Sequence, residues 1–289
     1  MDFAKCTTYQ FFNMQPSSVF LGFGLITLVS ASGYYPRAVN TSTDAGNCTT
    51  SGVHMIIARA STEAPGEGII GAVATMVKQA IPGSDSEAVD YPATLTQYQA
   101  SEQSGVAAMT KLVQEYTARC PDSKIAVMGY SQGAQVAADM MCGVSEKGFS
   151  NATQALSAAD SKNVVAMVLM GDPSHVSGQS FDAGTAKKTG LFPRQNLAAC
   201  PAAQTVSFCD DNDEFCDSGN SLQVHLSYVT KYGTQAAKFV TDKVLGNASN
   251  GTISQIGSSL SKEKANEVSS SRALGWSVLV AFVGLGLLV

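Results

Sequence analysis

The sequence has 289 residues, of which 45% are hydrophobic and 14% charged, and its formal net charge is −5. A chain of this length buries a substantial core, in one domain or at most two. The mild negative charge and the lack of a basic run argue against a nucleic-acid-binding protein.

The first feature along the chain is an uncharged apolar run at residues 19–29, followed by small residues that suit signal-peptidase cleavage after Ala31. We therefore expect residues 1–31 to be a signal peptide. Only Lys5 supplies positive charge before the run, and Met14 is an alternative start. A transmembrane anchor is the other interpretation, but the run is shorter than the roughly 20 residues that span a bilayer.

Strand-like apolar runs then alternate with helical patterns over residues 32–245. The runs predict strands at 53–58, 89–94, 124–128, 164–170 and 205–209, and the helical patterns predict helices at 68–81, 100–119, 132–142 and 225–245. Such alternation is typical of a parallel sheet covered by helices on both faces. We therefore predict one α/β domain, a three-layer α/β/α sandwich.

The last part of the chain combines a polar segment, 246–272, rich in Ser, Asn and Gly, with an uncharged apolar stretch at 273–289. This combination is the signal for a glycosylphosphatidylinositol anchor, with candidate attachment sites at 257–261 and 269–271. A single tail-anchoring helix is the alternative, although 17 residues are borderline for a span.

Cysteines and glycosylation sequons are those of an exported chain. Removal of residues 1–31 takes away Cys6 and leaves six cysteines, which allow fifteen disulfide pairings. None has the spacing to histidine of a zinc site, so we expect neither a metal nor a cofactor. Sequons occur at Asn40, Asn47, Asn151, Asn247 and Asn250.

The motif Gly-Tyr-Ser-Gln-Gly at residues 129–133 lies between a predicted strand and a predicted helix. A Gly-x-Ser-x-Gly motif arises by chance in about one chain in ten of this length, so its context decides its meaning. Strand, tight turn and helix form the context of a nucleophile elbow, in which glycines two residues before and after the Ser avoid clashes. The motif therefore nominates Ser131 as a nucleophile.

The general base must be one of three histidines. His54 lies inside a predicted strand and precedes Ser131, which is the wrong order for this fold. His175 follows a strand end and is a rival. His225 opens the last predicted helix, after the last strand and its loop, and is the better candidate. The orienting carboxylate is expected between that strand and His225, where the segment 209–216 (Cys-Asp-Asp-Asn-Asp-Glu-Phe-Cys) offers several.

These stretches, together with Ala-Arg-Ala-Ser-Thr-Glu at 58–63, Cys-Pro-Asp-Ser at 120–123 and His-Leu-Ser-Tyr at 225–228, resemble the cutinase and acetylxylan esterase family of secreted fungal serine esterases. They cover nearly the whole central domain in the family's order. The resemblance implies a small α/β-hydrolase fold with a mostly parallel, five-stranded sheet.

The resemblance also assigns residues. The family's aspartate lies four residues after the first cysteine of the small loop, which carries over to Asp213, and its histidine carries over to His225. The implied disulfides are Cys48–Cys120 and Cys209–Cys216, which leaves Cys142–Cys200. The oxyanion is expected to bind the Gln132 backbone N–H, with Ser61 nominated as a second donor. Ala60 stands where many cutinases carry Gly.

These assignments imply hydrolysis of a carboxylic ester by a Ser-His-Asp triad through an acyl-enzyme. The stretches at 90–93 and 170–173 resemble the acetylxylan esterase branch, which favours deacetylation of a cell-wall polysaccharide. Cutin polyester is the alternative, and residues 174–194 are expected to form a loop over the cleft. A catalytically idle, anchored wall protein on the same scaffold is a second alternative. We expect a monomer, secreted and held at the membrane or cell wall by the lipid anchor.

Overall fold

The computed structural model describes residues 48–146, 148–149 and 152–246. The predicted signal peptide at 1–31, the apolar stretch at 273–289 and all but the first residue of the predicted tether lie outside these ranges. The five sequons, Asn40, Asn47, Asn151, Asn247 and Asn250, lie outside them too. None of the helices in the described ranges combines the length and apolar character that a bilayer span requires.

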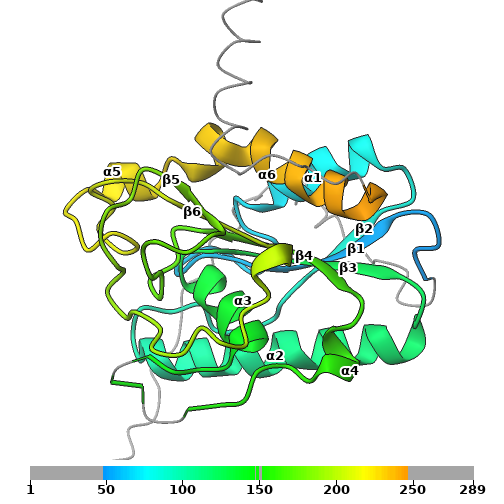
Figure 1. Cartoon of the computed structure of the whole chain (residues 1–289), viewed down its shortest axis with the longest axis horizontal. Helices are drawn as coiled ribbons and strands as arrows, with labels where there is room; N and C mark the ends of the chain where they lie inside the picture. The colour runs from blue at the N-terminus through cyan, green and yellow to red at the C-terminus, as the bar shows by residue number, and fades with distance from the viewer. Residues whose placement is uncertain (1–47, 147, 150–151, 247–289) are drawn as a thin grey trace, which may run out of the picture. The chain divides into compact units, whose positions relative to one another are not determined.

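A six-stranded parallel sheet forms the centre of the described region (Figure 1). Its strands, in the order in which they pair, are β2 (Asp85–Ala88), β1 (Val53–Ala58), β3 (Lys124–Tyr130), β4 (Val164–Met170), β6 (Thr205–Cys209) and β5 (Asp182–Gly184). The four inner strands are almost entirely buried. Their near-continuous apolar sequences are those expected when helices cover both faces of a sheet.

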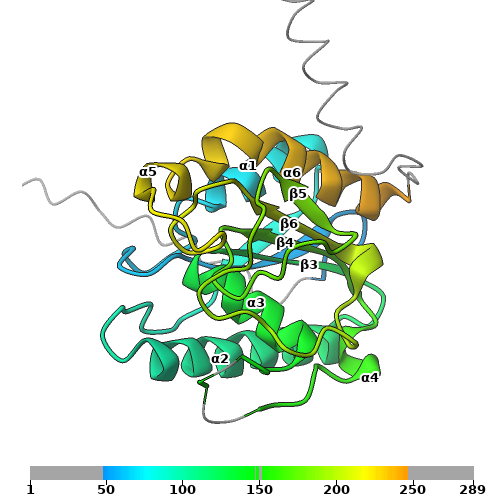
Figure 2. The ribbon, with the colours of Figure 1, turned by 60° about the vertical axis from the view of Figure 1, so that its left-hand side comes forward.

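Helices cover the two faces of the sheet, as Figures 1 and 2 show. The helices α1 (Gly71–Ala80) and α6 (Tyr228–Leu245) pack on one face, and α2 (Tyr98–Arg119) and α3 (Gln132–Cys142) on the other. Shorter helices are α4 (Ala158–Ser161) and α5 (Leu222–His225), with a 3-10 turn at Ala202–Gln204. Each face has its own apolar cluster, so the predicted three-layer α/β/α sandwich is confirmed.

The sheet differs from the prediction in two places. The resemblance implied five strands, but a sixth, β5, lies at one edge inside the segment expected to be a loop. It has only three residues, too few for a periodic pattern. The strand predicted at 89–94 is wrong, because the strand beside β1 is the polar stretch β2. As an edge strand β2 pairs only with β1, so its sequence does not need the apolar alternation of a buried strand.

The last predicted helix is also divided. Residues 222–225 form α5, which Ser221 caps by accepting a hydrogen bond from the Val224 backbone N–H, and α6 begins three residues later at Tyr228. His225 therefore ends a short helix and does not open the long one. Three disulfides join Cys48 to Cys120, Cys142 to Cys200 and Cys209 to Cys216, the pairs that the resemblance implied.

Candidate active site

Ser131 occupies a strained turn between β3 and α3. Its φ of 54° and ψ of −121° lie outside the regions that residues with a side chain ordinarily adopt. A Cβ on Gly129 would overlap the backbone of Gly133, and a Cβ on Gly133 would overlap the carbonyl of Ala58. Both glycines of the motif are therefore required by close backbone approach, and the tight turn places Ser131 at the carboxyl edge of the sheet.

Ser131 is joined to two distant side chains by hydrogen bonds. The Oγ of Ser131 lies 2.9 Å from Nε2 of His225, and Nδ1 of His225 lies 2.9 Å from Oδ2 of Asp213. Asp213 is fully buried and His225 nearly so. The predicted site residues Ser131, His225 and Asp213 are thus brought together from three separate segments into one relay. In the relay, the imidazole accepts from the hydroxyl and donates to the carboxylate.

The Asp213 carboxylate is fixed by donors from its own disulfide-closed loop. Its Oδ1 accepts hydrogen bonds from the backbone N–H groups of Phe215 and Cys216, at 2.7 and 2.8 Å. Burial by itself raises the pKa of Asp213, but the hydrogen bonds and charge of His225 and the two backbone donors outweigh it. The pKa of Asp213 therefore lies below its ordinary value.

The other carboxylates of the 209–216 segment face elsewhere. Asp210 accepts hydrogen bonds from Tyr232 and Lys231 of α6, and Asp211 pairs with Lys187. Only Asp213 contacts His225 among the described carboxylates. The sequence motif alone did not decide which of these carboxylates orients His225. The contact with the imidazole distinguishes Asp213 from its neighbours.

His225 is held in a space that a glycine provides. Gly171, directly after β4, has a φ of 63°, and a Cβ on it would lie 2.8 Å from Cε1 of His225. The ring of Phe215 packs on the imidazole with 4.5 Å between centroids. The Tyr130 hydroxyl donates to the carbonyl of His225. Sequence reasoning did not identify Gly171 as part of the site, although its place at a strand end was a signal.

The groups expected to bind an oxyanion lie beside Ser131. Gln132 begins α3, so its backbone N–H belongs to the first turn, where no acceptor exists within the helix. Ser61 lines the same cleft, and its Oγ has no hydrogen-bond partner among the described residues. The turn carrying Ser61 is held by Glu63, whose carboxylate accepts from the backbone N–H groups of Ala60 and Ile69 at 2.7 Å.

A cleft of about 450 Å³, which we call the Ser131 cleft, opens over the relay. Its apolar lining comprises Leu95, Tyr98, Pro173, Leu191, Phe192, Phe215, Leu222 and Leu226. The four leucines are between 46% and 59% exposed, which is unusual for side chains of this size. Of the segment expected to cover the cleft, residues 174–194, only Leu191 and Phe192 line it. No pattern in the sequence had indicated this apolar rim.

The other two histidines lie away from Ser131. His54 is bonded to Asp85 and Glu87 of β2 and stacks on Tyr116 at 3.7 Å, a structural role. His175 is buried with its Nδ1 3.7 Å from Oδ1 of Asp182, and it does not line the Ser131 cleft. Within the described ranges, no group of His, Cys, Asp and Glu has the arrangement of a metal site.

The chain is similar in sequence and in fold to proteins of one family. The family model for cutinase matches residues 48–244. Acetylxylan esterase 2 of Talaromyces purpureogenus is 35% identical over 202 residues, which are 66% of this chain and 86% of that protein. Cutinase 11 of Verticillium dahliae is 34% identical, over 66% of this chain and 68% of that protein. The solved catalytic core of acetyl xylan esterase from Trichoderma reesei superposes with a TM-score of 0.64 at 32% identity, covering 68% of this chain and all of that one. The chain therefore belongs to the cutinase family of serine carboxylic ester hydrolases.

Proposed function

We propose that this protein hydrolyses carboxylic esters with Ser131 as nucleophile, His225 as general base and Asp213 as the orienting carboxylate. The observation that carries the proposal is the hydrogen-bonded relay from Ser131 Oγ through the His225 imidazole to Asp213. The strained backbone at Ser131 supports it, since such strain concentrates at functional sites.

The reaction has two halves. Ser131 Oγ attacks the ester carbonyl while His225 Nε2 takes its proton, and the carbonyl oxygen becomes an oxyanion that receives hydrogen bonds from Gln132 and Ser61. The oxyanion collapses, the C–O bond to the alcohol breaks, and the imidazolium returns the proton to the leaving alcohol. Water then attacks the acyl-enzyme by the same steps and releases the acid. Asp213 holds the imidazole tautomer and stabilises the imidazolium.

The catalytic test is the loss of activity on substitution. We expect Ser131→Ala or His225→Ala to lower turnover by roughly 10⁶-fold, and Asp213→Ala by about 10⁴-fold. An organophosphonate should modify the wild type at Ser131 and leave Ser131→Ala unmodified, as measured by intact mass. Equal esterase activity in the wild type and Ser131→Ala would reject the proposal. It would favour instead an idle scaffold at the cell surface.

The first candidate substrate is an acetyl ester on a carbohydrate. Support comes from the identity of 35% to acetylxylan esterase 2 over most of that protein's length, and from the TM-score of 0.64 to a second acetyl xylan esterase. The stretches at 90–93 and 170–173 add to this, since they resemble the same branch.

A second candidate is an ester with a longer apolar acyl group, such as a cutin polyester. The feature that favours it is the Ser131 cleft, whose 450 Å³ exceed the needs of an acetyl group and whose rim carries the four exposed leucines. Each methylene group of the acyl chain that is buried in this cleft contributes about 0.8 kcal/mol of favourable free energy. Nitrophenyl esters of increasing acyl length, assayed beside acetylated xylan, separate the candidates. A fall in kcat/KM beyond acetate supports deacetylation, and a rise supports the longer ester.

We also propose export through the leader at 1–31 and a lipid anchor directed by 273–289. The three disulfides support export, because disulfides persist in oxidising compartments. Expression of the full chain in a fungal host tests both steps. The mature N-terminus should start at residue 32, and a phosphatidylinositol-specific phospholipase should release the protein from membranes. Retention of residues 1–31 or resistance to that lipase would contradict the respective step.

A further inference from the structure

Three carboxylates are buried around one guanidinium between α2 and α3. Arg194 donates from Nη2 to Asp139 of α3 and lies 3.0 Å from Oε1 of Glu146, in the segment after α3. Glu102 of α2 completes the set, which we call the carboxylate cluster. The four side chains are all at least nine-tenths buried. If all four groups were charged, the cluster would carry a net charge of −2 away from water.

Glu102 is the member that the ion pairs do not explain. It is fully buried and receives no hydrogen bond from a donor outside the cluster among the residues that the structure describes; its one side-chain hydrogen-bond contact is with the carboxyl of Asp139, and that bond needs a proton on one of the two groups. A buried, unpaired carboxylate is costly when ionised, and it takes up a proton instead. Burial accordingly raises the pKa of Glu102 to about 7, that of Asp139 to about 7 and that of Glu146 to about 8.

Other charged groups around the cluster add to its negative potential. Asp172, which follows β4, faces both Glu102 and Arg194. The hydroxyl of Tyr98 on α2 faces the carboxylates of Asp172, Glu102 and Asp139. His175 and Asp182 lie 3.7 Å apart, and His175 lines the same small cavity as Asp172 and Arg194. Among the described residues that face the cluster from these elements, Arg194 is the only permanent cation.

The cluster is connected to the Ser131 cleft through the chain around Arg194. The backbone N–H of Arg194 donates to Ser174 and that of Phe192 to Pro173, so this stretch lies along the segment after β4. Phe192 lines the Ser131 cleft, and its ring packs on Tyr98 at 5.5 Å and on Phe149 at 5.4 Å. Leu191 and Phe192, which line the cleft just before Arg194, are called the Phe192 wall. Through its ion pair with Asp139, Arg194 holds this wall against α3.

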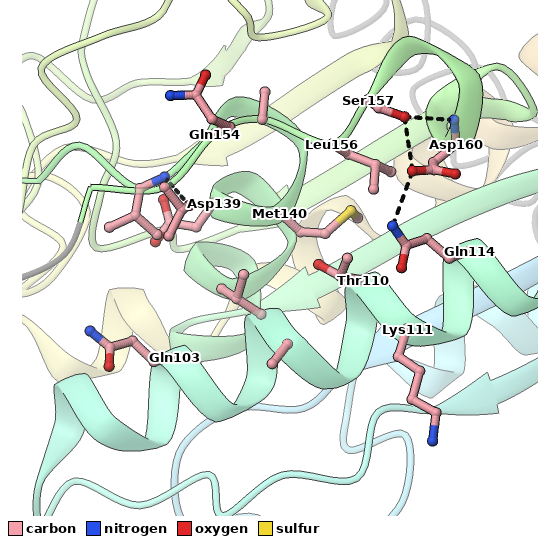
Figure 3. A pocket seen from close by; sticks show the side chains of 15 residues that line it. Gln103, Thr110, Lys111, Gln114, Asp139, Met140, Gln154, Leu156, Ser157 and Asp160 are labelled. Carbon is pink, nitrogen blue, oxygen red and sulfur yellow. Dashed lines mark hydrogen bonds between the residues drawn. The ribbon is translucent and has the colours of Figure 1, made fainter.

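The segment after α3 that carries Glu146 has little support from α2. Figure 3 shows a cavity, of about 640 Å³, between α2 and α3 and the stretch with Gln154 and Leu156. Asp139 lines this cavity, so the cluster lies at its edge. Open space separates the segment from much of α2, so its contacts lie mainly with α3 and with the chain around Arg194. They include the Glu146–Arg194 contact, the Cys142–Cys200 disulfide and the hydrogen bond from the Leu156 backbone N–H to Met140.

We propose that the carboxylate cluster is a proton-dependent lock on the Phe192 wall of the Ser131 cleft. With two of the three carboxyls protonated, the cluster is neutral, Arg194 stays paired with the remaining carboxylate and the wall is fixed. Loss of the protons leaves buried like charges that repel one another, so the wall and the described residues that follow α3, at 143–146 and 152–157, loosen and the cleft accepts bulkier esters. The selectivity part rests on the proposed esterase function, whereas the lock itself does not.

The direction of the pH effect follows from linkage. Carboxyls whose pKa in the folded protein is raised bind more protons than they do in the unfolded chain. The stability that they contribute is present in full at acidic pH, below their unfolded values. It is lost progressively as the pH rises through about 7 and 8, the folded values of the three groups.

Hydrogen exchange on the full-length Ser131→Ala protein tests the lock without any need for activity. Protection factors, corrected for intrinsic rates, are compared at about pH 5.5 and about pH 8.5. We expect protection at 190–197, 143–146 and 152–157 to fall by roughly tenfold or more at the higher pH, while β3 and β4 stay protected. Unchanged protection in all of these segments would overturn the proposal.

Glu102→Gln identifies the proton involved. Gln has the shape of Glu without its charge, and its amide can still donate a hydrogen bond to the carboxyl of Asp139, the one side-chain partner of Glu102 within the described structure. We expect this variant to keep its protection at about pH 8.5 and to lose less thermal stability between the two pH values than the wild type does. The matched control is Glu115→Gln, an exposed position on the same helix, which should behave as the wild type. The same pH response in Glu102→Gln and the wild type would refute the assignment.

Ester selectivity completes the test. In the wild type, the ratio of kcat/KM for nitrophenyl butyrate to that for the acetate should rise several-fold from about pH 5.5 to about pH 8.5, after subtraction of the Ser131→Ala background. In Glu102→Gln the ratio should stay constant. A pH-dependent loss of protection with no esterase activity would leave the lock intact and reject only the proposed function. A ratio that rises equally in both proteins would reject the control of selectivity by the cluster.

Discussion

The hydroxyl of Tyr228 donates a hydrogen bond of 2.8 Å to Oδ2 of Asp213, the same oxygen that accepts from His225. The hydroxyl oxygen in turn accepts from the backbone N–H of Asp210, also at 2.8 Å. Tyr228 is fully buried at the first position of α6. The long helix is therefore coupled to the carboxylate of the relay through a single side chain, and the position of that carboxylate depends on the packing of α6.

Tyr228→Phe should lower both stability and turnover. The change removes a hydrogen bond to a charged group, worth about 1.5–3 kcal/mol, and leaves the Asp210 N–H without its acceptor. We expect Tm to fall by about 5 °C or more, given roughly 2–4 °C per kcal/mol for a domain of this size. We expect kcat to fall about tenfold, because Asp213 loses one of its fixed donors. Thermal unfolding and steady-state kinetics measure the two effects.

Tyr232→Phe is the matched control for that variant. Its hydroxyl lies one turn further along α6 and donates to Asp210, not to Asp213. It should lower Tm while leaving kcat within about twofold of the wild type. Equal losses of kcat in the two variants would show that Tyr228 acts only through general stability.

Gly171→Ala should inactivate the enzyme more than it destabilises the fold. The new Cβ would lie 2.8 Å from the imidazole of His225, so the ring must move away from Ser131. A displacement of about 1 Å costs on the order of 10²-fold in rate. Gly178→Ala is the control, since Gly178 also has a positive φ, 89°, but open space around its Cβ. Gly178→Ala has the backbone strain of a positive φ but no new contact with a side chain. We expect it to retain near-normal kcat, measured on nitrophenyl acetate.

Ser61→Ala should lower kcat by about 10² to 10³, with a much smaller change in KM. The Ser61 Oγ has no hydrogen-bond partner in the described structure and lines the Ser131 cleft, so it is free to donate to an oxyanion. A donor used only in the transition state changes kcat and leaves substrate binding alone. Thr62→Ala, at the next residue along the same cleft, should stay within a few-fold of the wild type. An unaltered kcat in Ser61→Ala would remove its side chain from the mechanism.

The hydrogen bonds of His54 to Asp85 and Glu87 of β2 should contribute to the free energy of unfolding in a pH-dependent way. Burial lowers the pKa of His54, but hydrogen bonds and charge from Asp85 and Glu87 outweigh it, and the pKa is raised above 6.5. The pairing is therefore fully present below pH 6.5 and is lost as the pH rises through the folded value. The Tm of the wild type should exceed that of His54→Gln most at about pH 5.5, and the difference should narrow in alkaline buffer. A difference that stays constant with pH would contradict this.

The sequence predicted those parts of the fold in which burial dictates the residues. The ranges 53–58, 164–170 and 205–209 are the observed strands β1, β4 and β6, and 132–142 is helix α3. Burial on both sides forces continuous apolar runs in such strands, and a run is visible from sequence alone. At the edges this constraint vanishes. The polar β2 and the three-residue β5 obey no pattern, and Val89 and Tyr91 are buried without forming a strand.

The site was predictable to the extent that chain order and motif define it. The elbow nominated Ser131, elimination nominated His225, and only the resemblance selected Asp213 among its neighbours. The leucine rim and the carboxylate cluster were not foreseen. Both are formed by residues that are far apart in the chain, such as Glu102 and Arg194. Hydrophobic periodicity reports only local structure and therefore cannot predict such tertiary contacts.

The Cys209–Cys216 disulfide closes an eight-residue ring around Asp213 and brings the Phe215 and Cys216 amides onto its carboxylate. A newly made chain with these thiols reduced lacks that ring, and the Asp213 carboxylate is then held by hydrogen bonds alone, from Tyr228 and the loop amides. We therefore expect the reduced chain to hydrolyse esters more slowly than the oxidised one, so that full activity follows oxidative maturation.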